Sequence, residues 1–377
     1  MNIQDEIRKP ELLIDLEKTR NNIQFMLRKV RQNQVVFRPH FKTHQSIEIA
    51  ELYRQAGISA ITVSSLDMAA YFAAAGWQDI LIAFPINRRE MACINQLAAQ
   101  VRVSLLVDNL ESIDFLVDHA HYPMGVWIKV DTGLHRTGIW WQNGEQILSC
   151  AERMNNSPLL AFQGILTHAG HTYQAASSDD VIKMAEASKA AMLNVKQYLQ
   201  DHGCRQVRVS IGDTPGCRLL SDFHDVDEIR PGNFIFFDLE QWKLGVCTAE
   251  EITVAMACPI VSKNADRKEI VVYGGAIHFS KEMLMFEGES IYGLMAEKEG
   301  CHFSGILSDC RLLRTTQEHG VVRVNDSIFH QYHIGDLALI YPVHSCLTVQ
   351  AMGEYRDIYT GKMISTMVQQ RKNDSLL

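Results

Sequence analysis

The sequence predicts an α/β protein that combines a (β/α)8 barrel of the TIM type with a mainly β C-terminal domain. Through the first two thirds of the chain, short apolar segments rich in β-branched residues alternate with helical patterns. Such alternation is typical of a parallel sheet buried on both faces, and eight units favour a barrel over a doubly wound sheet. The doubly wound alternative also lacks its G-x-G-x-x-G motif. After about Gly245 short strands follow one another without long helices, which indicates the second domain.

The barrel strands are expected at eight short segments that are apolar or rich in β-branched residues, as buried strands require. In chain order these are Val35–Arg38, Ser59–Val63, Asp79–Phe84, Arg102–Val107, Gly125–Val130, Phe162–Thr167, Val207–Ile211 and Phe234–Phe237. Most of the gaps between them have helical periodicity. The expected helices are Ser46–Gln55, Leu66–Ala75, Arg89–Gln100, Ser112–His121 and Asp180–His202.

The second domain is expected to be built mainly from strands. These are Ile252–Met256, Glu269–Tyr273, Gly320–Arg323, Asp336–Ile340 and Cys346–Met352. The segment Glu11–Asp15 is also strand-like and precedes the barrel pattern, so we expect it to pair with this domain. The expected limits are therefore 21–245 for the barrel and 246–377 for the β domain, joined by a strand within residues 1–20.

Composition narrows the class of protein. Of the 377 residues, 47% are hydrophobic and 21% charged, and the formal net charge of -8 argues against nucleic acid as a partner. The first residues resemble neither a signal nor a transit peptide, and no apolar stretch reaches the roughly 18 residues of a spanning helix. We therefore expect a cytoplasmic protein without a membrane segment. The nine cysteines contain no C-x-x-C pair, so most should be buried thiols.

Chemically unusual residues gather where the predicted barrel strands end, which is where barrel enzymes place their active sites. The segments are Arg38–His44, Asp131–Arg136, His168–Tyr173, Gly212–Gly216 and Arg230–Asn233. Barrels often bind phosphate after strands seven and eight, through small residues with free backbone amides and a hydroxyl. The residues that suit this task are Gly212, Thr214, Gly232 and Asn233.

Lys42 is the candidate for covalent chemistry. It follows the first strand and is flanked by histidines and an arginine, whose positive charge favours the neutral amine that forms a Schiff base with a carbonyl cofactor. By pattern alone, a surface lysine in a loop is the more common situation. Lys129, inside the fifth strand, is a competing candidate.

Histidines and one cysteine suggest a metal or acid–base site. His344 and Cys346 would point to the same face of a strand, and an imidazole with a thiolate can bind zinc while leaving positions open for substrate. A buried cysteine beside a hydrogen-bonded histidine is the simpler interpretation of H-x-C alone. His168 and His171 could ligate a metal, act as acid or base, or only hydrogen-bond at the barrel mouth.

Several motifs in order resemble the D-serine dehydratase and D-threonine aldolase family of alanine-racemase-like, barrel-fold pyridoxal-phosphate enzymes. The motifs are Arg38–Ser46, Thr62–Ser65, His168–Tyr173, Gly212–Pro215, Arg230–Asn233, Gln317–Gly320 and His344–Cys346. The resemblance implies that Lys42 carries the cofactor. It also implies that Tyr173, Gly212, Thr214, Gly232 and Asn233 hold the cofactor and that His344 and Cys346 bind a divalent metal. Asp131–Arg136 resembles a stretch of alanine racemase, so Arg136 is a further expected cofactor contact.

The resemblance implies a lyase that acts on D-β-hydroxy amino acids and works as a homodimer. The His-x-Cys form is similar to zinc-dependent D-serine dehydratases, which yield pyruvate and ammonia; the aldolases more usually show His-x-Asp. Retro-aldol cleavage of the D-threonine aldolase type, with His168 or His171 as base, is the alternative, followed by an amino-acid racemase. A non-catalytic cofactor-binding protein would need neither the second domain nor the His-x-Cys pair. Two departures stand out: Phe234 and Phe236 replace usual tyrosines, and Gly274–His278 replaces an Asp-Ala-Gly stretch.

Overall fold

The structure is a computed structural model that describes residues 3–374. The chain divides into two compact units that are described separately below. We call them the barrel unit (residues 25–42 and 50–232) and the β unit (residues 1–24, 43–49 and 233–377). The domain limits expected from the sequence stay a prediction.

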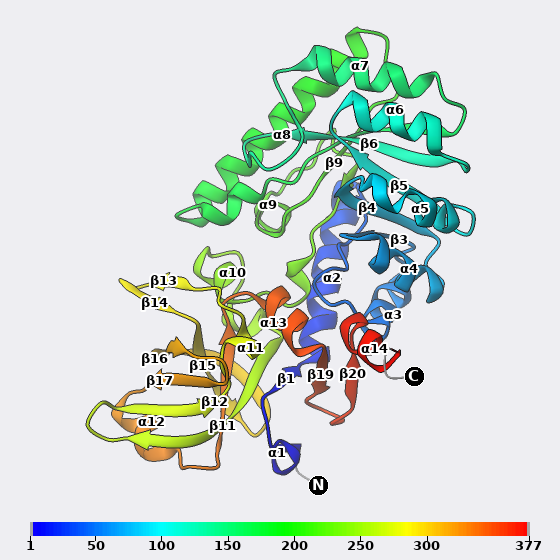
Figure 1. Ribbon diagram of the computed structural model, residues 1–377. Helices are drawn as coiled ribbons and strands as arrows, with labels where there is room; N and C mark the ends of the chain where they lie inside the picture. The colour runs from blue at the N-terminus through cyan, green and yellow to red at the C-terminus, as the bar shows by residue number, and fades with distance from the viewer. Residues whose placement is uncertain (1–2, 375–377) are drawn as a thin grey trace. The chain divides into compact units, whose positions relative to one another are not determined.

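The barrel unit contains eight parallel strands that form a nearly closed barrel, which confirms the predicted fold class (Figure 1). The order around the barrel is β2-β10-β9-β8-β6-β5-β4-β3. A bridge between His40 and Thr62 brings the end of the first strand against β3. The strands are β2 (Val36–Phe37), β3 (Ala60–Val63), β4 (Asp79–Pro85), β5 (Arg102–Val107), β6 (Met124–Asp131), β8 (Leu160–Leu166), β9 (Arg208–Ile211) and β10 (Glu228–Ile229).

Helices follow the strands and cover the outside of the barrel (Figure 1). They are α3 (Ile47–Gln55), α4 (Leu66–Ala74), α5 (Met91–Ala98), α6 (Leu110–His119), α7 (Gly144–Asn155), α8 (Ser178–Asp201) and α9 (Thr214–Leu219). Several begin at side-chain caps: Ser65, Asn109 and Ser177 each accept a backbone N–H of the first turn. The long helix α2 (Leu16–Asn33) contains the division between the two units.

Apolar side chains fill the interior of the barrel. Leu81, Leu106, Trp127 and Leu166 form one cluster and are each at most 1% exposed. Burying a leucine side chain fully contributes about 1.5–3 kcal/mol relative to leaving it in water. Leu106 and Trp127 are register partners on the adjacent strands β5 and β6, so their packing supports the alignment of these two strands.

The β unit is built on a mostly antiparallel sheet in the order β12-β17-β16-β15-β18-β11-β1-β19-β20. Because β11 pairs with both β12 and β18, six of these strands close into a ring. The strands are β1 (Glu11–Ile14), β11 (Val254–Asn264), β12 (Glu269–Tyr273), β15 (Gly293–Glu299), β16 (His302–Thr315), β17 (His319–Arg323), β18 (Leu337–Pro342), β19 (Glu354–Asp357) and β20 (Met363–Ser365). The expected pairing of the N-terminal strand is confirmed, since Glu11 to Ile14 pair with β11.

Two expected strands are wrong. Phe234–Phe237 forms a 3-10 turn (η3, Asn233–Ile235) in which Phe237 has a φ of 50°, and the eighth barrel strand is the polar-edged β10. The residues Phe234–Phe237 are apolar because they are buried in a turn, and periodicity cannot distinguish a buried turn from a strand. Cys346–Met352 is the helix α13 (Ser345–Met352), which ends at Gly353 in the left-handed conformation.

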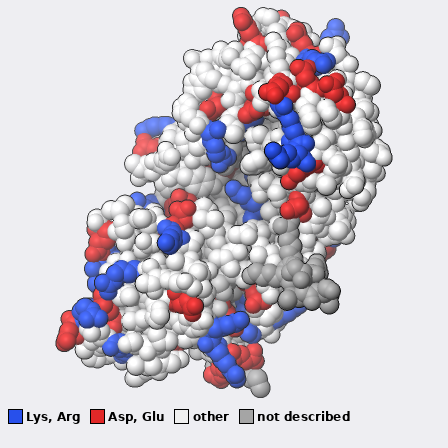
Figure 2. Space-filling model, in the orientation of Figure 1, with Lys and Arg blue, Asp and Glu red and all other residues white. Residues whose placement is uncertain are grey.

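Smaller elements complete the β unit. They are α1 (Ile3–Glu6), α10 (Leu239–Lys243), η4 (Ala249–Glu251), α11 (Ala276–Phe279), β13 (Leu284–Phe286), β14 (Glu289–Ile291), α12 (Asp326–Gln331) and α14 (Met367–Asp374). On the face shown in Figure 2, acidic and basic side chains are interspersed. Within residues 3–374, none of the helices combines the length and the apolar character that crossing a bilayer requires.

Candidate active site

Lys42 lies in the turn between β2 and α3, exposed between two fully buried neighbours, Phe41 and Thr43. The Phe41 ring packs against three aromatic rings of the barrel unit at centroid distances of 4.9–5.1 Å, those of Tyr53, Phe72 and Trp77. The backbone N–H of Lys42 lies 3.3 Å from Nδ1 of His40. Anchoring the residue before Lys42 in this way fixes the point from which its side chain projects.

A second lysine lies inside the barrel unit. Lys129, on β6, is only 5% exposed. Burial, together with the positive charges of Arg230 and Arg136, lowers its pKa to about 7. Arg230 is itself held in place, since its Nε donates to Ser210 Oγ at 2.7 Å. Lys129, Arg136 and Arg230 are thus close enough for their charges to interact, and positive groups of this kind can attract an anionic ligand.

His168 follows β8 and is held by the backbone. Its Nδ1 hydrogen-bonds the carbonyl oxygen of Gly212, which makes Nδ1 the donor and leaves Nε2 as an acceptor in the neutral ring. Burial lowers the pKa of His168 well below its usual value, and the charges of Lys42 and Lys129 act in the same direction. Gly170 is required beside this ring, because a Cβ there would lie 2.9 Å from His168 Nε2.

His171 lies next to a hydroxyl group on α8. Its Nε2 is 3.4 Å from Ser188 Oγ. Burial lowers the pKa of His171, and the nearby Asp131 carboxylate opposes that shift. At neutral pH both His168 and His171 are thus uncharged imidazoles.

The loop after β9 contains Gly212 and Thr214, two of the residues expected to bind phosphate. Thr214 donates its backbone N–H to the Tyr173 hydroxyl at 3.4 Å. Gly212 lies against Arg230, and a Cβ at Gly212 would lie 3.0 Å from that side chain. Asp213 accepts the N–H of Gly216 at 2.6 Å and begins α9. Because the Arg230 side chain lies so close to Gly212, a larger residue would be crowded there, and the Gly212 backbone faces the barrel mouth.

His344 and Cys346 meet in the β unit at the start of α13. His344 is the N-cap residue and Cys346 lies in the first turn, so a helix start rather than a strand face brings them together. Burial would lower the pKa of His344, but its hydrogen bond to Cys346 and the charges of Cys346, Asp238 and Glu240 raise it to about 10. The surroundings therefore favour a positive charge at this position.

Several groups orient the cysteine. Thr43 Oγ1 lies 3.4 Å from Cys346 Sγ, and Asn233 Nδ2 donates to the same sulfur at 3.7 Å. Asp238, which is fully buried, accepts from Asn233 Nδ2 at 2.7 Å and from the backbone N–H of Ser345 at 2.9 Å. Asp238 thus positions Ser345, which precedes Cys346, and the Asn233 side-chain amide that donates to the Cys346 sulfur.

A carboxylate accompanies the histidine. Glu240 Oε2 lies 3.8 Å from His344 Nδ1, which leaves Nε2 of the ring for another ligand. Burial and the charge of Asp238 raise the pKa of Glu240 to about 7. Across residues 3–374, no three His, Cys, Asp or Glu side chains are grouped to hold a metal ion.

The predicted site residues fall into two groups. Those in the barrel unit are Lys42, Arg136, His168, His171, Tyr173, Gly212, Thr214 and Gly232; those in the β unit are Asn233, His344 and Cys346. The side chain of Asn233, expected from the sequence to contact phosphate, hydrogen-bonds Asp238, Ser345 and Cys346. Sequence reasoning included Thr43 and Arg230 only as members of motifs, without a role, and missed Asp238. Asp238 could have been found from its spacing to Gln241, which is typical of a helix start.

Comparisons with known proteins identify the family. Residues 14–240 match the family model described as alanine racemase, N-terminal domain, and residues 253–357 match the putative serine dehydratase domain. The chain belongs to the alanine racemase N-terminal domain family. The resemblance inferred from the motifs is thereby confirmed.

Full-length relatives of this family are named as dehydratases. D-threo-3-hydroxyaspartate dehydratase from Delftia sp. (strain HT23) is 28% identical, covering 95% of this chain and 96% of its own. D-serine dehydratase from Dictyostelium discoideum is 28% identical, covering 98% of each chain. The solved structure of the Delftia enzyme superposes with a TM-score of 0.89 at 26% identity, covering 97% of this chain and 99% of its own.

Two further structures are of variants named D-threo-3-hydroxyaspartate dehydratase. One carries alanine in place of a histidine, and the other carries alanine in place of the cysteine two positions later and is the metal-free form. D-threonine aldolase from Filomicrobium marinum shares the fold, with a TM-score of 0.83 at 20% identity, covering 96% of this chain and 95% of its own.

Proposed function

We propose that this chain is a pyridoxal-phosphate-dependent, metal-assisted lyase that converts D-serine to pyruvate and ammonia. The observation that carries the proposal is the meeting of His344 and Cys346 at the start of α13, with Thr43 and Asn233 against the sulfur. The same two-residue spacing separates the histidine and cysteine replaced in the Delftia dehydratase. Similarity over nearly the whole chain to enzymes named as dehydratases supports the choice of reaction.

The barrel unit fits an anionic cofactor such as pyridoxal phosphate. The positive charges of Arg230 and Arg136 act on the buried Lys129, and those of Lys42 and Lys129 act on His168. A phosphate and a phenolate would relieve this mutual repulsion. Lys42 would bind the carbonyl carbon of the cofactor. Tyr173, Gly212, Thr214, Gly232, Asn233 and Arg136 would hold the rest of it.

The β-unit site fits a divalent metal of borderline softness. One imidazole nitrogen and one thiolate are donors that suit zinc, and two protein ligands leave open positions for water and substrate. The negative charges of Cys346, Asp238 and Glu240 act on His344 and would also stabilise a bound cation. We propose zinc as the metal, held by His344 and Cys346.

In the proposed reaction, Lys42 Nζ, released from the cofactor when the substrate amine replaces it, would take the α-proton of D-serine. The cofactor would supply an acceptor for the electron pair left at Cα, and the metal would supply a Lewis acid for the leaving β-hydroxyl. His344 and Cys346 hold that metal, with Glu240 near the second nitrogen of the imidazole. A dehydratase needs one base and an activated leaving group. A racemase needs a base on each face and gains nothing from the metal, so it ranks lower.

Retro-aldol cleavage is the second candidate. It needs a base for the β-hydroxyl proton, and His168 and His171 are both neutral imidazoles at the barrel mouth because burial lowers their pKa values. The cysteine of the H-x-C pair favours the dehydratase. We further propose that the protein is cytoplasmic and forms a homodimer. Sedimentation of the purified protein will test the homodimer.

The proposal is tested by product analysis. Purified protein supplied with pyridoxal phosphate and zinc is incubated with D-serine, D-threo-3-hydroxyaspartate and D-threonine. Pyruvate with equal ammonia from D-serine, lost in Cys346→Ala, supports the proposal. Glycine and acetaldehyde from D-threonine, without pyruvate from D-serine, would replace it with the aldolase. Oxaloacetate from 3-hydroxyaspartate alone would keep the elimination chemistry and change the substrate.

A further inference from the structure

Ile277 and His278, at the end of the stretch Gly274–His278, line a separate cavity in the β unit. The two glycines of this stretch allow close backbone contact: a Cβ at Gly274 would lie 2.4 Å from Cys258 Sγ, and one at Gly275 would lie 2.4 Å from Thr316 O. Backbone bonds then fix the segment, from Gly274 to Glu318 O at 2.8 Å and from Ala276 to Thr316 O at 2.7 Å. The short helix α11 that follows places His278 over the Tyr273 ring.

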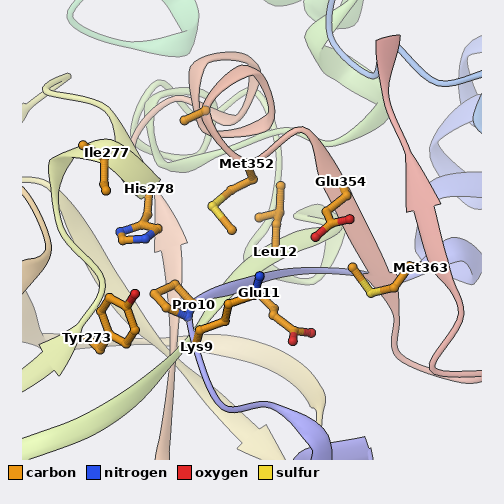
Figure 3. A pocket seen from close by; sticks show the side chains of 11 residues that line it. Lys9, Pro10, Glu11, Leu12, Tyr273, Ile277, His278, Met352, Glu354 and Met363 are labelled. Atoms are coloured by element: carbon orange, nitrogen blue, oxygen red, sulfur yellow. The ribbon is translucent and has the colours of Figure 1, made fainter. Parts of the chain in front are cut away.

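The cavity has a volume of about 220 Å³ and is lined by both charged and apolar side chains (Figure 3). Its polar groups are Lys9, Tyr273, His278 and Glu354, and Leu12 and Met352 contribute apolar surface. In the view of Figure 3 the Met352 and Leu12 side chains lie between His278 and Glu354. The apolar surface thus separates a basic end from an acidic end.

The basic end presents a hydrogen-bond donor. His278 Nδ1 accepts the backbone N–H of Gly275 at 3.1 Å, so the proton of the neutral ring is on Nε2. Burial lowers the pKa of His278, which keeps the ring neutral at physiological pH. The ring of Tyr273 lies edge-on to His278, with 5.7 Å between centroids, and brings a hydroxyl to the same end.

The acidic end presents an uncommitted carboxylate. Glu11, which also lines the cavity, is engaged by Arg356, whose Nη2 lies 3.4 Å from Glu11 Oε1. Glu354 has no ion pair within the described part of the chain, and neither does Lys9. The two opposite charges line one cavity without neutralising each other.

We propose that this cavity binds a small zwitterion whose carboxylate and ammonium are separated by a short apolar chain. The carboxylate accepts from His278 Nε2–H and the Tyr273 hydroxyl and lies near the positive charge of Lys9. The ammonium donates to Glu354, and the methylene chain covers Met352 and Leu12. An ω-amino acid has this chemistry. The inference does not rest on the proposed lyase reaction, because none of these residues takes part in it.

The experiment is calorimetric titration of the purified full-length protein with γ-aminobutyrate, δ-aminopentanoate and ε-aminohexanoate. Saturable binding of at least one, with a negative heat-capacity change from apolar burial, is the expected result. Hexylamine and hexanoate, which each lack one charge, should bind at least tenfold more weakly. These comparisons need no mutation and so do not depend on a variant that folds.

Two variants locate the binding site. Glu354→Gln and His278→Phe should each weaken binding at least tenfold, whereas Glu299→Gln, a change of the same kind at an exposed position in the same sheet, should leave it unchanged. Binding should also persist in Lys42→Ala. Absence of saturable binding for all three probes, equal affinity in Glu354→Gln, or loss in Lys42→Ala would each overturn the proposal. None of these outcomes bears on the proposed lyase activity, which the product analysis with D-serine tests separately.

Discussion

The Thr43 hydroxyl lies 3.4 Å from the Cys346 sulfur, although 303 positions separate the two residues in the chain. Both residues are buried. Thr43 directly follows Lys42, so the residue next to the proposed cofactor lysine contacts the proposed metal ligand. A thiolate has no proton to give, so the hydroxyl must donate once the sulfur is ionised or bound to a metal.

Loss of this hydroxyl should weaken the metal site. In Thr43→Val the shape is kept but the donor to Cys346 is removed, and changes of outer groups of this kind typically cost about 10–100-fold in metal affinity. Competition with a chromophoric chelator measures that affinity. In the cobalt-substituted protein, the sulfur-to-cobalt charge-transfer band should shift as well.

The serine variant separates hydrogen bonding from packing. Thr43→Ser keeps the hydroxyl and should retain an affinity within about threefold of the original protein, while Thr43→Val loses it. Equal metal affinity in Thr43→Val and the original protein would refute a role for the hydroxyl.

Lys129 should make the stability of the cofactor-free protein depend on pH. Its pKa is lowered from 10.5 to about 7 in the folded chain. Between these values the unfolded chain binds a proton that the folded chain does not, so the free energy of unfolding rises with pH in this window and falls as pH drops toward 7. One proton gives a slope of at most about 1.4 kcal/mol per pH unit.

Replacing Lys129 tests whether its lowered pKa causes this pH dependence. Lys129→Met should flatten the pH dependence between about pH 7.5 and 9.5, as measured by urea unfolding. Lys183→Met, at a side chain that is 75% exposed, is the matched control and should keep the original slope. An unchanged slope in Lys129→Met would contradict a neutral buried amine.

Arg38 links strands of the barrel through two ion pairs. Its Nε lies 2.7 Å from Glu228 Oε2, and its Nη1 lies 2.6 Å from Asp79 Oδ1. The Arg38 and Glu228 side chains are only 8% and 3% exposed. Arg38→Met leaves the Glu228 carboxylate buried without this partner, and breaking a buried pair in this way costs about 3–5 kcal/mol.

Urea unfolding of single and double variants measures the Arg38 effect. The double variant Arg38→Met with Glu228→Gln should recover part of the loss, because the buried Glu228 charge that lost Arg38 is removed as well. A double variant as unstable as Arg38→Met would show that packing, and not charge, dominates.

The sequence predicted the barrel because strand and helix periodicities alternate there with little ambiguity. It failed at Phe234–Phe237 and at Cys346–Met352, where burial makes every position apolar and removes the period that separates strand, turn and helix. The strand Glu228–Ile229 was missed because its first residue is a buried glutamate that is paired with Arg38, and pattern reasoning treats glutamate as a surface residue.

The candidate site could be predicted in part. Residues at strand ends, such as Lys42 and His168, are visible because the barrel dictates where they lie. Thr43 and Asp238 could not be identified as partners of the H-x-C segment, because their contacts join segments far apart in the chain and follow only from the fold. The pairing of His344 with Cys346 was expected from a strand, but a helix start produces it.

The central claim, that Lys42 carries the cofactor, is tested most directly by absorption spectroscopy of three proteins purified with pyridoxal phosphate. The original protein and Lys129→Met should both show a visible band that sodium borohydride abolishes, and peptide mapping should place the reduced cofactor on Lys42. Lys42→Ala should show no such band. A band that persists in Lys42→Ala and disappears in Lys129→Met would show that Lys129, and not Lys42, carries the cofactor. The absence of a band in all three proteins would contradict the proposal that the chain binds pyridoxal phosphate.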